Sequence, residues 1–278
     1  MRALLTIAHL TLHEARRRRI VLAAFVLGLA YLVLFGIGFH FIARDIERHG
    51  HISHIQFRML LNFFILAGLY GANFLTIMAA VLVPVDTLSG EISSGVMQTL
   101  AAKPIRRSEI LLGKWLASAL LVACYLLFLS GGVLAIARLR GGFMPPDVGT
   151  GLPLMLLESV VLLTLSIGGG TRMSTVANGI TVLGFYGLAF LGSWVEQIGT
   201  LAGNGTARTI GTVASLVMPS ESLWQLAAHH MQPALMRELH LTPFSPASVP
   251  SGAMVVWAAG YVVVVLLLGL RWFARRAL

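Results

Sequence analysis

Residues 20–42 read IVLAAFVLGLAYLVLFGIGFHFI, a run without a charged side chain. About 20 apolar residues in a helix are enough to cross a hydrocarbon core of about 30 Å. Comparable stretches follow at 60–85, 112–137, 152–169, 176–195 and 253–273. The apolar residues form blocks and lack the alternation of membrane β-strands. The sequence therefore predicts an all-α membrane protein, with six transmembrane helices in a single transmembrane domain over residues 1–278.

Composition excludes a soluble protein. Of the 278 residues, 57% are hydrophobic and only 11% are charged, whereas soluble domains have about 25% charged residues. The net charge of +9 suits the cytoplasmic ends of membrane helices, which face anionic lipid. No basic stripe with interleaved aromatic residues indicates a nucleic-acid partner. The single cysteine, Cys124, allows no disulfide within the chain.

Basic residues also predict the orientation. If the N-terminus is cytoplasmic and every span crosses, thirteen lysines and arginines lie inside and seven outside. The cytoplasmic set includes the run Arg16–Arg19. Because positive charge is enriched on the cytoplasmic side, both termini are expected there.

Residues 2–18 are predicted to form an amphipathic helix lying in the membrane interface. One stripe is apolar and the other is basic: Leu4, Ile7, Ala8, Leu12 and Ala15 against Arg2, His9, His13 and Arg16. An ordinary solvated helix is the alternative.

The longest connection is residues 196–252, on the outer face. Its apolar stretches, such as Ile210–Met218, are too short to span a bilayer, and Pro219 and Pro233 interrupt it. We expect short re-entrant or interfacial helices here. A small water-soluble outer domain is the alternative.

The segment most informative about function follows the second span. Residues 86–115 read DTLSGEISSGVMQTLAAKPIRRSEILLGKW. Ser89 is predicted to cap a short helix, with Glu91 in its first turn, where the helix dipole favours an anion. An apolar stripe of Ile92, Val96 and Leu100 would follow.

The second half of this segment is predicted to start the next helix. Pro104 would end the short helix, Ser108 would cap the next one, and Glu109 would lie in its first turn. A short amphipathic helix held beneath the membrane by two spans is suited to docking into a partner's groove.

This segment resembles the loop motif of type-2 ABC transporter permeases, the kind found in copper-maturation systems and in drug or antibiotic exporters. The residues that carry the resemblance are Glu91, Gly95, Leu100, Pro104, Arg107, Gly113 and Lys114. The N-terminal helix and the six spans also fit that family. Val96 and Met97 depart from it, since threonine and leucine are frequent at those places.

In that family the loop carries a cytoplasmic coupling helix that packs against a separate ATP-binding subunit. The resemblance therefore implies an ATPase-coupling role for the segment 86–109. The implied residues are Asp86, Glu91, Gly95, Leu100, Pro104, Arg106 and Arg107.

The resemblance further implies a transport subunit, not an enzyme, in a bacterial or archaeal cell membrane. Two cytoplasmic ATP-binding subunits and a second, identical or similar permease would be its partners. ATP and Mg would be bound by those ATPase subunits, and no cofactor by this chain. The residues agree in one respect: Trp115 follows Gly113 and Lys114, so the phosphate-binding loop GxxxxGK[ST] is absent.

Polar residues within the predicted spans are a second set of candidates. Asn73, Glu158 and Asn178 either line a substrate path or join helices. A charge at membrane depth costs roughly 2.5–3.5 kcal/mol on insertion scales, so Glu158 is expected to find a partner. Arg138 or Arg140, near the outer end of the third span, could supply one.

Histidines in the first outer loop are a further candidate. His49, His51 and His54 have the short spacing that zinc or copper sites use. Exposed loop histidines are the preferred interpretation, and no metal site is predicted.

Alternative functions remain at this point. An ion-coupled secondary transporter could use Glu158 to carry protons, but inverted repeats or broken helices are not evident. An intramembrane enzyme would need a nucleophile with its base, and none is visible. An ATP-driven machine that exerts force on a lipid or on an outer-face protein would retain the same coupling loop as an exporter.

Overall fold

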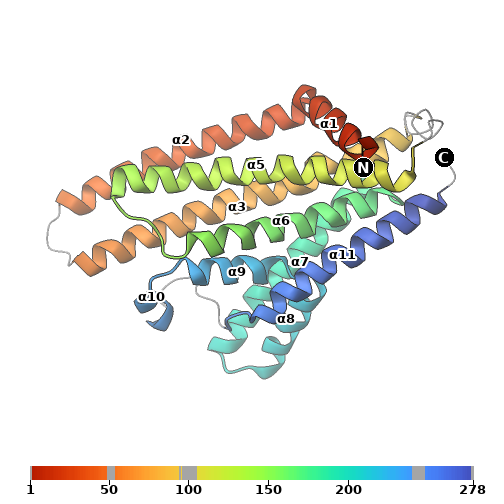
Figure 1. The fold of residues 1–278 in the computed structure, drawn as a ribbon. Helices are drawn as coiled ribbons and strands as arrows, with labels where there is room; N and C mark the ends of the chain where they lie inside the picture. Colours follow the sequence, from red (N-terminus) through yellow and green to blue (C-terminus); the bar gives the residue numbers. More distant parts are fainter. Residues whose placement is uncertain (1, 49–53, 94, 96–104, 240–247, 277–278) are drawn as a thin grey trace.

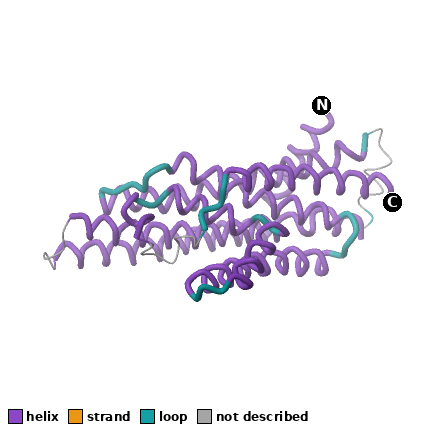
Figure 2. The backbone as a smooth tube through the Cα atoms, turned by 90° about the horizontal axis from the view of Figure 1, so that it is seen from below, coloured by secondary structure: helices purple, strands orange, loops and turns teal. Residues whose placement is uncertain are grey.

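Helices make up nearly all of the molecule. The computed structural model describes residues 2–48, 54–93, 95, 105–239 and 248–276, and within these ranges there is no β-strand (Figure 2). Six helices are long and apolar enough to span a membrane. They are α2 (Arg19–Arg48), α3 (His54–Ser93), α5 (Arg107–Gly141), α6 (Val148–Gly170), α7 (Thr175–Leu201) and α11 (Gly252–Arg275).

The predicted helical membrane fold is therefore confirmed. Each helix covers its predicted span, although most extend further, α3 most of all. Long helices persist beyond the apolar stretch because neighbouring helices, as well as lipid, stabilise them.

Two helices form the centre of the bundle. In the most apolar 18-residue stretch of each helix, 61% of α3 and 67% of α6 is buried. The corresponding share is 17% for both α2 and α11. On α3, Leu61, Ile65 and Leu69 recur every fourth residue and are fully buried. This spacing places them on one face, and α3 packs against α5 and α6.

The short helix α1 (Arg2–Arg17) lies at an angle to α2, at the end of the bundle where α5 begins and α11 ends (Figure 1). We call this end the N-terminal end. Ile7, Ala8 and Ala15 are buried and α1 packs against α5, while Leu5 and Leu10 stay exposed. The predicted amphipathic helix is thus present, with one apolar face held by the bundle.

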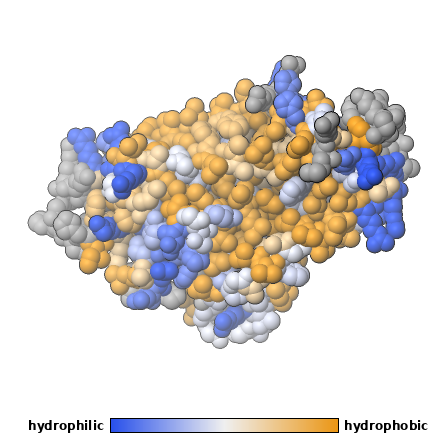
Figure 3. All heavy atoms as spheres, viewed as in Figure 1, coloured by the Kyte–Doolittle hydropathy of each residue, from blue (hydrophilic) through white to orange (hydrophobic). Residues whose placement is uncertain are grey.

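The lateral surface is apolar. Leu22, Val26, Leu29 and Val33 on α2 are each more than half exposed. In Figure 3 hydrophobic residues cover most of the visible face, and hydrophilic residues gather mainly towards the two ends. Such a surface is compatible with lipid rather than with water.

The described part of the segment 196–252 contains three short helices, α8 (Gly205–Val217), α9 (Ser220–His230) and α10 (Ala234–Leu239). Helix α8 folds back on α7, and Gly211 permits the close approach, because a Cβ there would lie 2.7 Å from the carbonyl oxygen of Gly192. Helix α9 packs against α6 and α7. Its buried Leu223, Trp224 and Ala227 make it part of the core.

Candidate coupling site

The predicted coupling segment begins differently from expectation. Ser89 does not cap a new helix, because α3 continues to Ser93. Pro84 is accommodated within α3, and the hydroxyl of Thr87 donates a hydrogen bond to its carbonyl oxygen at 2.6 Å. Ser89 likewise donates to the carbonyl oxygen of Val85 at 2.6 Å. Glu91 therefore lies in the last turn of α3 and not in a first turn.

Glu91 forms a largely buried ion pair with Lys114 of α5. The Lys114 side chain is 5% exposed and that of Glu91 is 12% exposed. Lys114 Nζ also lies 3.4 Å from the carbonyl oxygen of Thr87, to which it donates. These contacts join the end of α3 to the first turns of α5, so they fix the two helices from which the loop projects.

Asp86, which also lies near the C-terminal end of α3, connects this helix to two other elements. The hydroxyl of Thr175, at the start of α7, donates to Asp86 Oδ1 at 3.2 Å. Arg18, between α1 and α2, lies 4.0 Å from Asp86 Oδ2. The hydroxyls of Ser89 and Thr175 are 2.8 Å apart, which adds a second link to α7.

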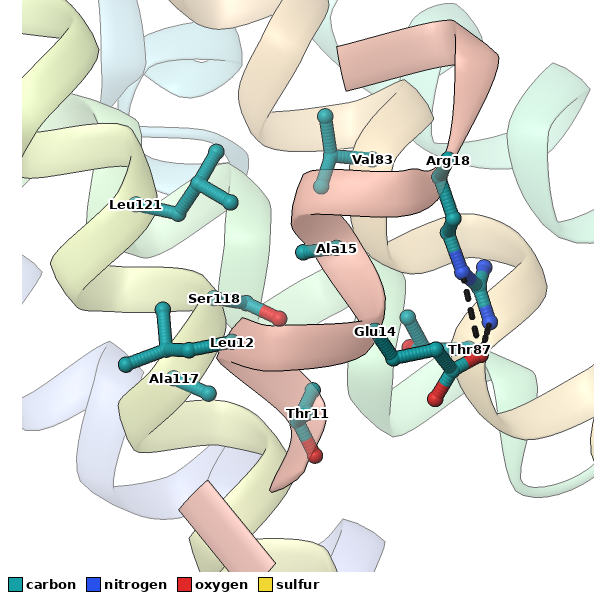
Figure 4. A pocket seen from close by; sticks show the side chains of 10 residues that line it. All are labelled: Thr11, Leu12, Glu14, Ala15, Arg18, Val83, Thr87, Ala117, Ser118 and Leu121. Carbon is teal, nitrogen blue, oxygen red and sulfur yellow. Dashed lines mark hydrogen bonds and ion pairs between the residues drawn. The ribbon is translucent and has the colours of Figure 1, made fainter. Parts of the chain in front are cut away.

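Helix α1 closes over this region, as Figure 4 shows. Arg18 pairs with Glu14 at 2.7 Å, and both side chains border a cavity of about 10 Å³ between α1, α3 and α5. That volume is near the lower limit for one water molecule. Helix α1 therefore packs closely against α5, and Val83 and Thr87 of α3 line the small cavity beside it.

Gly113 has a packing role. A Cβ on Gly113 would lie 2.8 Å from Ile7 Cγ2 and 2.9 Å from the carbonyl oxygen of Leu4. Any larger residue would push α1 off α5. The glycine of the motif thus lets the N-terminal helix rest on the base of the loop.

The start of α5 holds the C-terminal end of the chain. Arg107 Nη1 donates to the carbonyl oxygens of Arg276 at 2.6 Å, Ala274 at 3.3 Å and Phe273 at 3.4 Å. Arg276 in turn donates to the carbonyl oxygen of Thr171, in the turn between α6 and α7. Arg107 therefore ties α11 and the α6–α7 turn to the loop.

The cap predicted for α5 was wrong by two residues. Arg106, not Ser108, is the N-cap, while Glu109 does occupy the first turn. The Glu109 carboxylate accepts a hydrogen bond from the Arg106 backbone N–H at 3.4 Å. A carboxylate in this position suits the helix dipole.

Part of the predicted segment lies outside the described residues. Val96, Met97, Leu100 and Pro104 belong to that part, so the predicted coupling helix remains a prediction. Gly95 is described as a turn residue with φ of 78°, a backbone conformation that favours glycine. Of the histidines, His49 and His51 are outside the described residues.

His54 is the first residue of α3, and its side chain is not described. No group of three or more His, Cys, Asp or Glu residues that could hold a metal ion occurs in the described ranges.

The polar residues of the spans contact other helices. Asn73 Nδ2 of α3 donates to Glu158 Oε2 of α6 at 2.9 Å, and Asn178 Nδ2 of α7 donates to the carbonyl oxygen of Ser166 at 2.6 Å. The suggested pairing of Glu158 with Arg138 or Arg140 was wrong, because both arginines are exposed at the far end of α5. All three side chains thus form hydrogen bonds between helices, and a place on a substrate path stays a prediction.

Sequence reasoning missed two features. Lys114 stood in the motif without a partner, and its separation from Glu91 along the chain gave no sign of the ion pair. Glu221, buried in the first turn of α9, was not singled out. A carboxylate just after Pro219 and Ser220 is a helix-start signal that could have located it.

Six spanning helices and a connected polar site at one end define a multi-pass membrane protein of the transporter type. Comparison with protein families agrees: the family model described as ABC-2 family transporter protein matches residues 5–278. The chain belongs to this family, whose members are membrane subunits of ABC transporters. A search of curated proteins found no match.

Proposed function

We propose that this chain is the permease subunit of an ATP-driven exporter, and that the segment 86–109 couples it to a separate ATP-binding subunit. The observation that carries the proposal is the Glu91–Lys114 ion pair. It holds the two ends of the loop at a fixed separation, so a force applied to the loop is transmitted to α3 and α5 rather than absorbed by it.

The helices reached through these contacts support the proposal. Asp86 links the loop to α7 and to the start of α2 through Thr175 and Arg18, and Arg107 links it to the end of α11. Contacts from one short segment therefore reach four of the six spans, α3, α5, α7 and α11, and the junction between α1 and α2. A partner that displaces the loop would bias the whole bundle between two packings.

Family membership supports association with an ATP-binding subunit. In the proposed assembly, two cytoplasmic ATP-binding subunits would bind ATP and Mg, and a second permease, identical or similar to this one, would complete the transporter. Both termini would face the cytoplasm of a bacterial or archaeal cell. The N-terminal end of the bundle would then carry the ATPase, and α8–α10 would lie towards the outside.

The test is co-purification with an ATP-binding subunit encoded beside this chain, followed by ATPase measurement in nanodiscs. Glu91→Ala and Arg107→Ala are expected to leave membrane insertion intact and to lower complex yield or stimulated turnover several-fold. Arg140→Ala, exposed at the far end of α5, is the matched control. Unchanged yield and turnover in both loop variants would refute the coupling role.

Export and mechanical work require a separate measurement. ATP-dependent uptake of a candidate substrate into inside-out vesicles would support export, since their lumen corresponds to the outer side. ATP turnover that depends on an outer-face protein or lipid, without any solute movement, would favour the mechanical alternative.

A further inference from the structure

A second polar centre lies inside the bundle, far from the coupling contacts. Its members are Glu158 of α6, Asn73 of α3 and Glu221 of α9, and their exposed fractions are 0%, 2% and 7%. The coupling assignment uses none of them. Two buried carboxylates here need a physical explanation, because a buried charge without a counter-charge is costly.

The register of α9 brings the two carboxylates together. Asn62 Nδ2 of α3 donates to the carbonyl oxygen of Met231 just after α9, and the rings of Tyr70 and Trp224 are 5.2 Å apart. Helix α9 therefore runs antiparallel to α3. Asn73 is about 16 Å along α3 from Asn62, and Glu221 is about 15 Å along α9 from Met231.

Neither carboxylate forms an ion pair with a described residue. Electrostatic interactions join Glu158 to Glu221, and both carboxylates to Tyr70 of α3 and Tyr186 of α7. Helices α5 and α11 also pack on α6. Yet α5 has no charged residue between Lys114 and Arg138, and α11 has none before Arg271.

A proton on Glu158 would allow a second hydrogen bond between Glu158 and Asn73. Asn73 and Glu158 share one bond, yet Asn73 Oδ1 and Glu158 Oε1 are buried and have no hydrogen-bond partner among the described residues. Both atoms are acceptors while the carboxyl is ionised. A proton on Glu158 Oε1 would make it a donor, and an acid facing a primary amide can form two hydrogen bonds.

We propose that the junction of α3, α6 and α9 is a proton-binding site, in which Glu158 carries one proton that is exchangeable with Glu221, and that the bound proton keeps α9 docked in the bundle. Release of the proton to solvent leaves two carboxylates facing each other and repels the first turn of α9. Burial also raises the pKa of Glu221 to about 7, so near neutral pH Glu221 can exchange a proton with Glu158, and the last proton of the pair leaves only above that pH. The inference does not depend on the coupling assignment.

The experiment is infrared spectroscopy of the full chain in nanodiscs, titrated with pH. A carbonyl stretch of a protonated carboxylic acid is expected just above neutral pH, where Glu221 has lost its own proton, and should disappear on further alkalinisation. Glu158→Gln should remove it, whereas Glu109→Gln, at the exposed start of α5, should not. Glu221→Gln should move the midpoint of its loss, since the two carboxylates interact.

A second readout follows the position of α9. In a Cys124→Ser background, Ser222→Cys, a buried position on α9, is expected to react at least several-fold faster with a water-soluble thiol reagent once the infrared band has disappeared. Each of three results would overturn the proposal. The infrared band could be absent from the unsubstituted protein, it could persist in Glu158→Gln, or the reaction of Ser222→Cys could be independent of pH. Loss of the band on replacing K⁺ with Na⁺ at constant pH would overturn it in favour of a metal cation.

Discussion

Lys114 of α5 and Glu91 of α3 are 23 positions apart in the sequence and form an ion pair that is largely shielded from solvent. The pair closes the base of the proposed coupling loop. Glu91 therefore acts on a partner through the position of the loop, and its carboxylate is turned towards α5. This distinction determines how its variants should behave.

Breaking the ion pair on one side should destabilise the protein strongly. Lys114→Met leaves the Glu91 carboxylate buried without its counter-charge, a change that costs about 3–5 kcal/mol in buried pairs. Thermal unfolding in detergent, followed by tryptophan fluorescence, measures the effect.

Removing both charges is the control. The double variant Glu91→Gln with Lys114→Met should recover more than half of the lost stability, because no unpaired charge remains. Single and double variants that are equally unstable would show that the two side chains do not act as a pair.

Replacing Gly113 should weaken the packing of α1 against α5. Gly113→Ala places a methyl group against Ile7 and against the backbone of Leu4, and overpacking of this kind costs about 1–3 kcal/mol. A lower unfolding temperature and faster proteolysis after Arg16–Arg19 are expected. The double variant with Ile7→Ala should recover only part of the loss, since the Leu4 carbonyl remains in place.

Gly131→Ala is the matched control on the same helix. Apart from its chain neighbours and the backbone of its own helix, no described heavy atom lies within 4 Å of a Cβ at Gly131, and alanine favours helix over glycine by about 1 kcal/mol. It should be neutral or stabilising. If Gly113→Ala behaved in the same way, α1 would not depend on close contact with α5.

The spans were predictable because hydropathy reports directly on exposure to lipid. The ends of α3 were not, because residues beyond Val85 stay helical through Thr87, Glu91 and their tertiary contacts with α5. The motif located Glu91, Gly113 and Lys114, but not the ion pair of Glu91 with Lys114 or the contact of Gly113 with α1. Pairing across α3 and α5 depends on helix rotation, which hydropathy does not report.

The sequence did not indicate Glu221 for a different reason. It lies in a short helix whose flanking prolines were noticed, but its importance comes from the register of α9 against α3 and α6. That register depends on contacts such as Trp224 with Tyr70, between residues far apart in the chain. Local sequence signals could have indicated where α9 starts but not which buried carboxylate it approaches.

Asn178 should contribute through a single interhelical bond. Asn178→Leu removes the donor to the Ser166 carbonyl oxygen, and such bonds in membrane proteins contribute about 0.6 kcal/mol on average and up to about 1.7 kcal/mol. We expect a loss towards the upper end, because Asn178 is fully buried. Val176→Ala, at an exposed site on the same helix, should change the unfolding temperature less; an equal change would argue against the bond.

Because Glu221 is buried, we expect the stability of the folded protein to fall as the pH rises. Its pKa is raised from 4.5 to about 7 by burial, so between these values the folded protein binds a proton that the unfolded chain releases. The stabilisation is complete below about pH 4.5 and is lost as the pH rises through 7. A shift of this size corresponds to about 3 kcal/mol.

Unfolding temperatures at about pH 5 and about pH 8 should therefore differ in the unsubstituted protein, with the lower value at the higher pH. Glu221→Gln should reduce that difference and the exposed Glu238→Gln should not; an undiminished difference in Glu221→Gln would assign the pH dependence to another group.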